Sequence, residues 1–566
     1  MSLEMKTTTF PQINDEKWQE VAVESLRGLP FEKLITKTLE GIDIRPLYTK
    51  EFVDKELQNN QKKMISVIRS GTKSPDWTIA QKSYHNDQEQ FMQEIKESLQ
   101  KGNEAIVYDG NNPVQWEGEQ ELKELAELVQ THPLYAFNVD EQDPFTTIFT
   151  MIPEANRKKV TGAVTGSFTV PEGYHLLRQA SADMVPIHLK GADIVTELAV
   201  TLAKAAEAAS EFKSFTAFSN QFFVRFAVDT HFFMEIAKLR AFRALWQTFA
   251  TAYGHDKPNR VPIYSETSLR TYSKLDPYVN LLRAGNEAFS AVLGGTDILT
   301  VHPHDVLTKP TAASIRNARN VQLVIKEETL VNYVLDPSGG SYFIDTLTNE
   351  MIDKAWKLFQ TIEAQGGYKT YVTSGALDKR LEKARTERME QVSFREKSLI
   401  GTNMYADLSE EPVASEETVT VQGRLAEPYE NLRAYFQENQ PKVVVLTFGQ
   451  LKDFKQRADF VTSFLATAGI KTDWSPAFET IQEGKDWIKE NDFDYGVICI
   501  PPEDTVDVME ELIQDFPKEK WIDVAGNYSD QENWLQAGVS DFIFQGQDQL
   551  AKLTSIKKRW EGGHTR

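Results

Sequence analysis

The chain has 566 residues and a formal net charge of −21, from 62 Lys and Arg against 83 Asp and Glu. This acidic balance disfavours nucleic acid or an anionic membrane surface as the main partner, because both would be repelled. Hydrophobic residues make up 41% and charged residues 26% of the chain, as in ordinary globular proteins. The length predicts roughly three or four domains, or one large barrel followed by a smaller domain.

The first 40 residues are polar with scattered aromatic side chains at Phe10, Trp18 and Phe31. Because such aromatics need burial, residues 1–40 are predicted to be an arm that packs on a larger body. The first residues show neither the apolar core of a signal peptide nor an Arg-rich amphipathic pattern, and no uninterrupted apolar stretch is long enough to span a membrane. A single cysteine, Cys499, excludes an intrachain disulfide and suits a reducing compartment, so a cytoplasmic location is expected.

Residues 41–370 alternate short apolar runs with longer amphipathic stretches. The segments 195–208 and 232–249 have helical periodicity, and Glu235 and Lys238 lie one turn apart on the second. This alternation predicts an α/β fold with a parallel sheet, and over such a length a (β/α)8 TIM barrel. The expected strands are 105–108, 134–139, 185–189, 261–264 and 298–301.

Three histidines lie near or just after the ends of expected strands of this barrel, where catalytic residues are typically found. His302 and His304, with Asp305, come directly after the strand 298–301 and invite a metal-binding reading, but no third ligand is evident nearby. A structural role in the loop is therefore favoured. His188 lies near the end of the expected strand 185–189. We find no pattern typical of a catalytic serine triad, a zinc protease or a paired-cysteine site.

Residues 371–435 are predicted to be a helical and acidic linker that ends in a Ser-, Glu- and Thr-rich stretch. Residues 436–566 then repeat an α/β pattern, with a helix expected over 454–468. This pattern predicts a flavodoxin-like, doubly wound domain. Cys499 lies in one of its apolar runs and is expected to be a small buried hydrophobe. The expected strands are 442–448, 495–500, 521–524 and 542–544.

The loop after the strand 442–448 is the expected place for a ligand, because ligands of open parallel sheets bind at the carboxyl ends of the strands. Its sequence, Gly-Gln-Leu-Lys-Asp-Phe over 449–454, lacks both the dinucleotide fingerprint and the phosphate-loop motif. Asp453 is interpreted as the N-cap of the following helix. Between His304 and His564 the chain has no histidine, so no strand or loop of this domain before His564 offers an imidazole to a metal-centred cofactor.

Long segments distributed over nearly the whole chain closely resemble the methylmalonyl-CoA mutase family. They are long and occur in the family's order, so a chance match is improbable. They are LEGIDIRPLYT (39–49), DWTIAQ (76–81), HFFMEIAKLRAFRALW (231–246), ETSLRTYSKLDPYVNLLR (266–283), AFSAVLGGTD (288–297), SIRNARNVQLVIKEE (314–328), DPSGGSYFIDTLT (336–348) and AWKLFQTIEAQGG (355–367).

The resemblance implies a TIM barrel that binds an acyl-CoA along its axis and a C-terminal flavodoxin-like domain that binds adenosylcobalamin. In that family the cobalt–carbon bond breaks homolytically, and the resulting radical rearranges methylmalonyl-CoA to succinyl-CoA. The barrel shields the radical and orients the thioester.

The family's cobalamin motif, Asp-x-His-x-x-Gly, is degenerate in this chain. Aligned on 448–450, Leu451 stands at the Asp position, Asp453 at the cobalt-ligating His and Gln456 at the Gly. Leucine cannot accept the imidazole N–H, and Gln456 carries a Cβ where the cofactor needs close backbone approach. Two later contact elements correspond to 498–500 and 525–526 and have also changed.

The barrel has lost the family's substrate-contacting residues as well. Lys82 replaces the active-site tyrosine and Ala80 an arginine. Aligned on 191–192, Pro186 stands at the substrate histidine and His188 is displaced by two; a shifted alignment would restore His188. No catalytic, cofactor-binding or metal site is therefore expected to be intact.

The segments that match the family are those that build the fold, while the ligand-contacting residues differ. In this respect the chain resembles the non-catalytic small subunit of heterodimeric methylmalonyl-CoA mutases. The resemblance implies a catalytic large subunit as partner, which holds the adenosylcobalamin and which the arm 1–40 wraps. The alternatives are an autonomous enzyme that uses His302, His304 or His188 on the same barrel, and a docking protein for the GTPase chaperone that loads such mutases.

Overall fold

The computed structural model describes residues 13–409, 421–515, 520–529 and 531–562. Phe10 and most of the Ser-, Glu- and Thr-rich stretch fall outside these residues. The described chain divides into two compact units. Unit 1 takes residues up to 268 together with 284–302 and 315–384, and unit 2 takes 269–283, 303–314 and the chain from 385 onward. No helix in the described ranges is long and apolar enough to cross a membrane.

Unit 1 contains two parallel sheets, one of five strands and one of four. The first has the order β3-β11-β10-β9-β8 and the second the order β4-β5-β6-β7. A parallel bridge between Lys82 and Val107 links the end of β3 to β4, and only Gln179 separates β7 from β8. The strands are β3 (Thr78–Ile79), β4 (Ile106–Asp109), β5 (Leu134–Val139), β6 (Gly162–Gly166), β7 (Leu177–Arg178), β8 (Ala180–Asp183), β9 (Phe222–Val228), β10 (Ile263–Thr267) and β11 (Ile298–Thr300).

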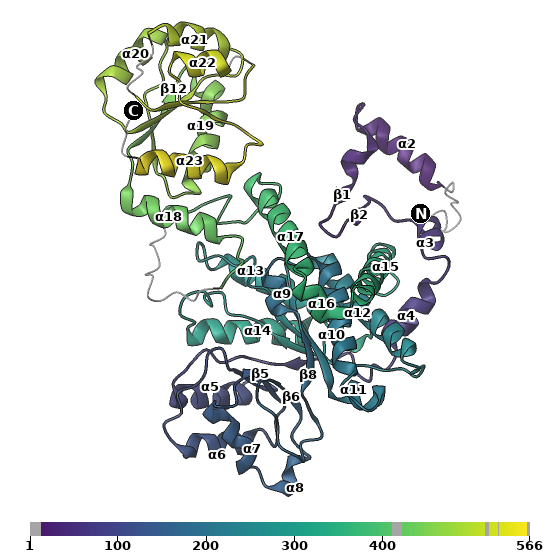
Figure 1. Ribbon diagram of the computed structural model, residues 1–566. Helices are drawn as coiled ribbons and strands as arrows, with labels where there is room; N and C mark the ends of the chain where they lie inside the picture. Colours follow the sequence, from purple (N-terminus) through teal and green to yellow (C-terminus); the bar gives the residue numbers. More distant parts are fainter. Residues whose placement is uncertain (1–12, 410–420, 516–519, 530, 563–566) are drawn as a thin grey trace, which may run out of the picture. The chain divides into compact units, whose positions relative to one another are not determined.

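The central strands of unit 1 are buried on both faces, as parallel strands covered by helices are. Every residue of β9 is buried, and so is every residue of β10. The long helices α10 (Ile194–Ala209), α12 (Phe232–Ala252) and α15 (Tyr342–Ala364) pack on one another beside the sheet (Figure 1). The side chain of Asp193 caps α10 by accepting a hydrogen bond from the N–H of Thr196.

The remaining helices of unit 1 are shorter and mostly link the strands. They are α3 (Lys50–Glu56), α4 (Gln61–Arg69), α5 (Gln88–Gln100), α6 (Glu119–Leu128), η2 (Pro144–Thr147), α7 (Ile148–Met151), α8 (Glu154–Arg157), α9 (Val185–Leu189), α11 (Phe215–Gln221), η3 (Val331–Tyr333) and α16 (Gly367–Thr373). Three further helices contain residues of both units: α13 (Val279–Leu293), α14 (Ala312–Glu328) and α17 (Ala376–Ser393).

One predicted strand of unit 1 is wrong. Residues 185–189 form the short helix α9, and the strand is the preceding β8. A carboxylate oxygen of Asp183 accepts a hydrogen bond from the N–H of Val185, and Pro186 stands in the first turn of the helix. Both features favour a helix start, because proline supplies helical φ and its missing N–H costs nothing there. The apolar run Val-Pro-Ile-His-Leu misled the prediction.

The N-terminal segment forms the helix α2 (Asp15–Ser25), the turn η1 (Phe31–Leu34) and a small antiparallel pair, β1 (Thr36–Lys37) with β2 (Asp43–Ile44). Asn14 caps α2 through its side chain. No residue of α2 is buried, although Trp18 meets Phe31 edge to face at 6.0 Å between ring centroids. Among the described residues, the helix thus contacts Phe31 through Trp18, and Val21 stays 53% exposed.

Unit 2 contains a five-stranded parallel sheet in the order β13-β12-β14-β15-β16, a 2-1-3-4-5 arrangement in chain order. Its strands are β12 (Val443–Thr447), β13 (Thr472–Trp474), β14 (Tyr495–Cys499), β15 (Ile522–Ala525) and β16 (Phe542–Ile543). Its helices are α18 (Glu427–Asn439), α19 (Leu451–Ala466), α20 (Ile481–Glu490), α21 (Thr505–Leu512) with the turn η5 (Ile513–Asp515), α22 (Gln531–Ala537) and α23 (Gln549–Glu561).

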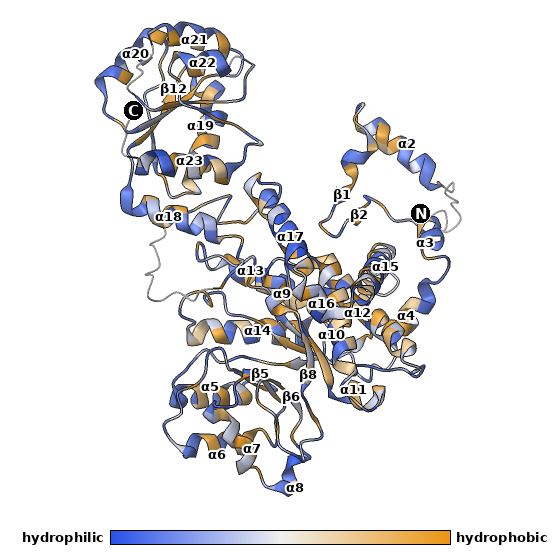
Figure 2. Cartoon of the chain, viewed as in Figure 1, coloured by the Kyte–Doolittle hydropathy of each residue, from blue (hydrophilic) through white to orange (hydrophobic). Residues whose placement is uncertain are grey.

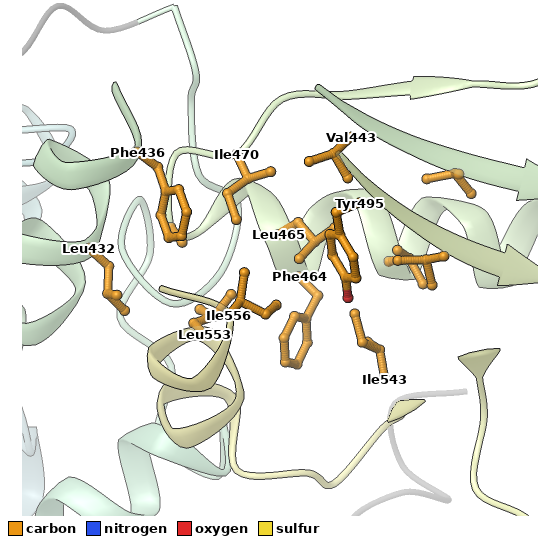
Figure 3. Packing of buried hydrophobic residues seen from close by; sticks show 14 of the residues in the cluster. Leu432, Phe436, Val443, Phe464, Leu465, Ile470, Tyr495, Ile543, Leu553 and Ile556 are labelled. Carbon is orange, nitrogen blue, oxygen red and sulfur yellow. The ribbon is translucent and has the colours of Figure 1, made fainter. Parts of the chain in front are cut away.

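Hydrophobic side chains cover both faces of this sheet. Figure 1 shows α19 and α23 on one face and α20, α21 and α22 on the other, and hydropathy colouring shows apolar strands between amphipathic helices (Figure 2). Alternate residues of β12 point to opposite cores, Val443 to one and Val444 to the other. Figure 3 shows Leu432 and Phe436 of α18 in the first of these cores. Cys499 is completely buried there, which confirms the prediction for it.

Candidate functional site

A layer of charged side chains lies among the strands of unit 1. The guanidinium group of Arg225 on β9 donates hydrogen bonds to Asp183 Oδ2 at 2.9 Å and to Glu266 Oε2 at 2.7 Å. It also lies 4.2 Å from the centre of the Phe137 ring. Burial raises the pKa of the Glu266 carboxyl, but the charge of Arg225 outweighs burial and holds that pKa far below its ordinary value. The cluster is therefore ionised and internally paired.

Lys82 and His302 complete this layer. Lys82, predicted at the position of the family's tyrosine, donates to Asp109 Oδ2 at 2.5 Å. Burial raises the pKa of Asp109, yet the charge of Lys82 leaves that pKa below its usual value. The imidazole Nδ1 of His302 lies 2.7 Å from the hydroxyl of Tyr84, and Nε2 lies 3.8 Å from Glu266. Lys82 and the His302 ring are thus both in contact with side chains of this chain.

Aromatic side chains fill the space next to this layer. Phe137 of β5 lies 4.9 Å from Tyr264 of β10 and 6.4 Å from Phe223 of β9, measured between ring centroids. Because β5 does not pair with β9 or β10, these rings meet across the interior between strands that are not neighbours. Ala80, the predicted replacement of an arginine, belongs to the same buried cluster. Its carbonyl accepts a hydrogen bond from Thr300 at 2.7 Å.

His188 is the centre of a second buried network in unit 1. Its Nδ1 lies 2.7 Å from Glu197 Oε1, and its Nε2 lies 2.7 Å from the Ser268 hydroxyl. The sequence of contacts resembles a serine–histidine–acid triad, which chain order did not reveal. All three side chains are buried, so the arrangement offers no exposed nucleophile. Pro186, two residues before, is exposed.

Lys238 extends this network on α12. Its ammonium group lies 3.2 Å from Glu197 Oε2 and 2.5 Å from Glu235 Oε2, so the predicted neighbours Glu235 and Lys238 form an ion pair. Burial lowers the pKa of Lys238, but the two carboxylates more than reverse this effect. Burial raises the pKa of Glu235 to about 7, against the opposing charge of Lys238. These groups stabilise one another inside the fold.

His304 and Asp305 do not join His302 in a metal site. The ring of His304 stacks on Tyr278 at 5.0 Å between centroids within unit 2, and Asp305 Oδ2 accepts hydrogen bonds from Thr311. Across the residues that the structure describes, no group of three or more His, Cys, Asp or Glu side chains is placed to hold a metal ion.

The loops at the carboxyl ends of the strands in unit 2 are packed against each other. Gly449, after β12, adopts a φ of +86°, and a Cβ added there would lie 3.1 Å from Pro501, which follows β14. The N–H of Gly449 donates to the carbonyl of Phe478 at 2.9 Å. A ligand of such a sheet would bind between these loops, where this chain places its own atoms.

Arg457 occupies the same edge of the sheet. From α19 its Nη1 donates to the carbonyl of Ile500 at 2.9 Å, to the Thr505 hydroxyl at 2.8 Å and to the Tyr528 hydroxyl at 2.6 Å. A Cβ added at Gly526 would lie 2.3 Å from the Tyr528 hydroxyl. We did not identify Arg457 or Tyr528 from the sequence, because neither lies at a position of the cobalamin motif and they are 71 residues apart.

The three residues of the degenerate cobalamin motif lie on the first turns of α19. Leu451 is its first residue and is 55% exposed, and Gln456 is also exposed. Asp453 is the third helical residue, so its predicted role as N-cap is wrong: Gln450 is the N-cap and makes no side-chain hydrogen bond there. An acidic side chain in the first turn still favours the helix through its dipole.

These residues do not fit a cobalamin held by an imidazole. No histidine lies between His304 and His564, and the helix presents a carboxylate and two exposed side chains. Arg457 and Tyr528 fill the adjoining edge with a fixed positive charge and an aromatic ring. Burial raises the pKa of the Cys499 thiol to about 12, so this residue does not supply a thiolate ligand.

The chain is therefore an α/β protein with parallel sheets. Its own side chains are closely packed at the ends of the strands where such folds usually bind ligands. Residues 176–471 match the methylmalonyl-CoA mutase family. The chain belongs to this family.

Individual relatives agree with that assignment. The chain is 28% identical over 546 residues to the methylmalonyl-CoA mutase small subunit of Porphyromonas gingivalis, covering 87% of this chain and 88% of the relative. It is 34% identical over 311 residues to the probable small subunit of Mycobacterium bovis, where the match spans 52% of this chain and 50% of the relative. A methylmalonyl-CoA mutase of Rhizobium meliloti is 29% identical over 460 residues, 70% of this chain and 64% of the relative.

Proposed function

We propose that this chain is the non-catalytic small subunit of an adenosylcobalamin-dependent methylmalonyl-CoA mutase. Its partner, a large subunit, carries the cofactor and the substrate and catalyses the isomerisation of methylmalonyl-CoA to succinyl-CoA. The observation that supports the proposal is close side-chain packing between the strands of unit 1 and among the loops at the carboxyl ends of the strands of unit 2, where the resemblance places the family's ligands. No step of the reaction is assigned to its residues.

The proposal includes a (β/α)8 TIM barrel over residues 41–370 and a flavodoxin-like domain over 436–566, joined through 371–435. The parallel strand orders support both folds. The Lys82–Val107 bridge and the direct continuation of β7 into β8 support closure of the barrel. The 2-1-3-4-5 order of unit 2 is that of flavodoxin-like sheets.

The interior of the barrel supports the absence of a substrate site. An acyl-CoA bound along the axis would need space between opposite strands, and Phe137, Tyr264 and Phe223 meet there. A long thioester would also have to displace the ion pairs of Arg225, whose side chain is only 9% exposed. Leaving such charges unpaired inside a protein costs several kcal/mol.

The first test is a titration of adenosylcobalamin into the purified chain, followed by its visible spectrum. We expect no binding up to high cofactor concentration. Mutase activity is expected only when the large subunit is added. Tight binding with a spectral change of the lower ligand, or isomerisation by this chain alone, would contradict the proposal.

Two sets of substitutions separate the missing ligand from the filled crevice. The triple variant Leu451→Asp, Asp453→His, Gln456→Gly restores the motif but leaves Arg457 and Tyr528 in place, so we expect it to remain free of cofactor. Adding Arg457→Ala and Tyr528→Ala empties the edge and is expected to allow weak binding. If the triple variant binds the cofactor as well as the five-fold variant does, Arg457 and Tyr528 do not block the crevice in solution.

The N-terminal segment 1–40 is proposed to pack on the large subunit. The helix α2 has no buried residue, and Val21 is 53% exposed beside Trp18. Val21→Lys is expected to weaken co-purification with the large subunit without changing thermal unfolding of this chain. Gln19→Lys, an exposed position on the same helix, is the control. If affinity capture retrieves the GTPase chaperone and not the large subunit, the docking alternative replaces this proposal.

A further inference from the structure

A pocket in unit 1 opens among the segments that precede β3, β10 and β11. These segments include Arg69 and Thr72 before β3, Arg260 before β10 and Thr296 before β11. The pocket therefore lies toward the amino ends of the strands, away from the carboxyl ends where barrel enzymes carry out catalysis. The family's ligand residues play no part in it.

Three guanidinium groups line this pocket. Arg69 is 42% exposed, and the side chains of Arg260 and Arg243 are 19% and 6% exposed. Apolar walls from Ile68 and Val334 adjoin them. Arginine is suited to planar recognition of carboxylate and phosphate groups, because it presents several N–H donors in a fixed plane.

The carboxylates around the pocket are shared among more than one cation. Asp297 accepts from Arg243 at 2.5 Å and from Arg260 at 2.8 Å, so one negative charge faces two positive charges. Asp336 is engaged by Arg240 at 2.7 Å and lies 3.8 Å from Arg69. Arg240 also pairs with Asp345 at 2.7 Å, so Asp336 and Asp345 together balance Arg240 and Arg69. The local excess of positive charge lies at Arg243 and Arg260, which share Asp297.

Arg243 shows the same imbalance. Its Nη atoms donate to the carbonyls of Val261 and Gly295 and to Asp297. Among the described residues its buried Nε has no hydrogen-bond partner, and an unsatisfied buried donor is costly. Burial lowers the pKa of Arg243 to about 10, and the neighbouring charge of Arg260 adds to the effect while Asp297 opposes it. An anion bound beside Arg243 and Arg260 would offset the local excess of positive charge that these two side chains share.

We infer that this pocket binds a compact anion through Arg69, Arg243 and Arg260. The ligand class is a carboxylate or phosphate group, free or on a small molecule whose apolar part rests on Ile68 and Val334. The site is independent of the mutase reaction and of the cofactor, because its residues lie at the opposite ends of the strands from Glu266 and His302.

The test is isothermal titration of the full chain with inorganic phosphate and, separately, with acetate, at ionic strength held constant with sodium chloride. We expect saturable binding of one anion, and the comparison shows whether phosphate or carboxylate is preferred. Arg69→Gln is expected to weaken binding about tenfold, because it removes one charge-assisted contact from an exposed side chain. Asp76→Asn removes a negative charge from the pocket wall and is expected to strengthen binding.

Arg316→Gln is the matched control, since it changes net charge as Arg69→Gln does at an exposed position of α14. Phosphate also stabilises proteins non-specifically, so the readout is the heat of saturable binding. The absence of saturable binding for both anions overturns the inference. So does an Arg69→Gln variant that binds like the wild type, or an Arg316→Gln variant that loses binding equally.

Discussion

Replacing Arg225 by methionine tests whether the charged layer of unit 1 is a structural element. Methionine keeps about the length of the unbranched part of the side chain and removes the charged guanidinium group. Arg225 makes two short ion pairs, at 2.9 Å to Asp183 and 2.7 Å to Glu266, with 9% of its side chain exposed. Removing one partner from a buried pair of this kind costs about 3–5 kcal/mol, because the remaining carboxylate is left uncompensated.

The pH dependence gives the prediction a sign. In the wild type the pKa of Glu266 is held far below its ordinary value, chiefly by Arg225 against the effect of burial. Without Arg225, burial dominates and raises that pKa. The folded variant then binds a proton more readily than the unfolded chain. The destabilisation of Arg225→Met should therefore be largest at neutral pH and decrease as the pH falls toward the acidic range.

The assay is urea-dependent hydrogen exchange, read by mass spectrometry on peptides that cover β9 and β10. These peptides report the free energy of opening at the site itself. The double variant Arg225→Met, Glu266→Gln should recover about 2 kcal/mol or more of the loss, since the more deeply buried of the two uncompensated carboxylates is gone. Arg316→Met, at an exposed position, is the control. A loss below about 1 kcal/mol, or additive effects in the double variant, would refute the reasoning.

Three further predictions concern other buried groups. Lys552→Met should lower the free energy of unfolding of unit 2 by about 3 kcal/mol in urea, because Lys552 lies 2.6 Å from the fully buried Asp523; the exposed Lys558→Met is the control, and equal effects would contradict the prediction. Burial raises the pKa of Glu235 to about 7, so folded chain binds more protons than unfolded chain between about pH 4.5 and 7, and stability from this group falls as pH rises. Glu235→Gln should flatten the pH profile of thermal unfolding in that window, and an unchanged profile would be inconsistent with it. Cys499, whose pKa burial raises to about 12, should react with a thiol reagent at pH 8 only at the rate of unfolding; immediate labelling of native protein would exclude burial.

Elements with strong local patterns could be predicted from the sequence. The strand 134–139 was predicted with the bounds of β5, and the helix expected over 232–249 corresponds to α12. Both depend on local periodicity, which a single chain records directly. In contrast, β9 went unpredicted although all of its residues are buried. Arg225 interrupts its apolar run, and only the distant Asp183 and Glu266 explain why a charge is tolerated there.

For the candidate sites, the sequence predicts only which of the family's residues are replaced. The replacements at Lys82, Leu451 and Asp453 are visible in the sequence because the family's motif defines what should stand there. What fills the space is not visible, since Arg457 meets Tyr528 across 71 residues of chain. The contact between Phe137 and Tyr264 likewise depends on which strands face each other across the interior. Long-range packing of this kind follows from topology and has no local sequence signal.

The filled sites also bear on how such a subunit would fold. A site built for a buried ligand leaves polar groups without partners until the ligand arrives, and each such group is destabilising. Here Arg457 satisfies the carbonyl of Ile500 from within the chain, and Lys82 neutralises Asp109. Under the proposed role this chain therefore reaches a stable fold without cobalamin or acyl-CoA. It can then bind the large subunit in its final folded form. The large subunit need not bind its cofactor before the two subunits assemble.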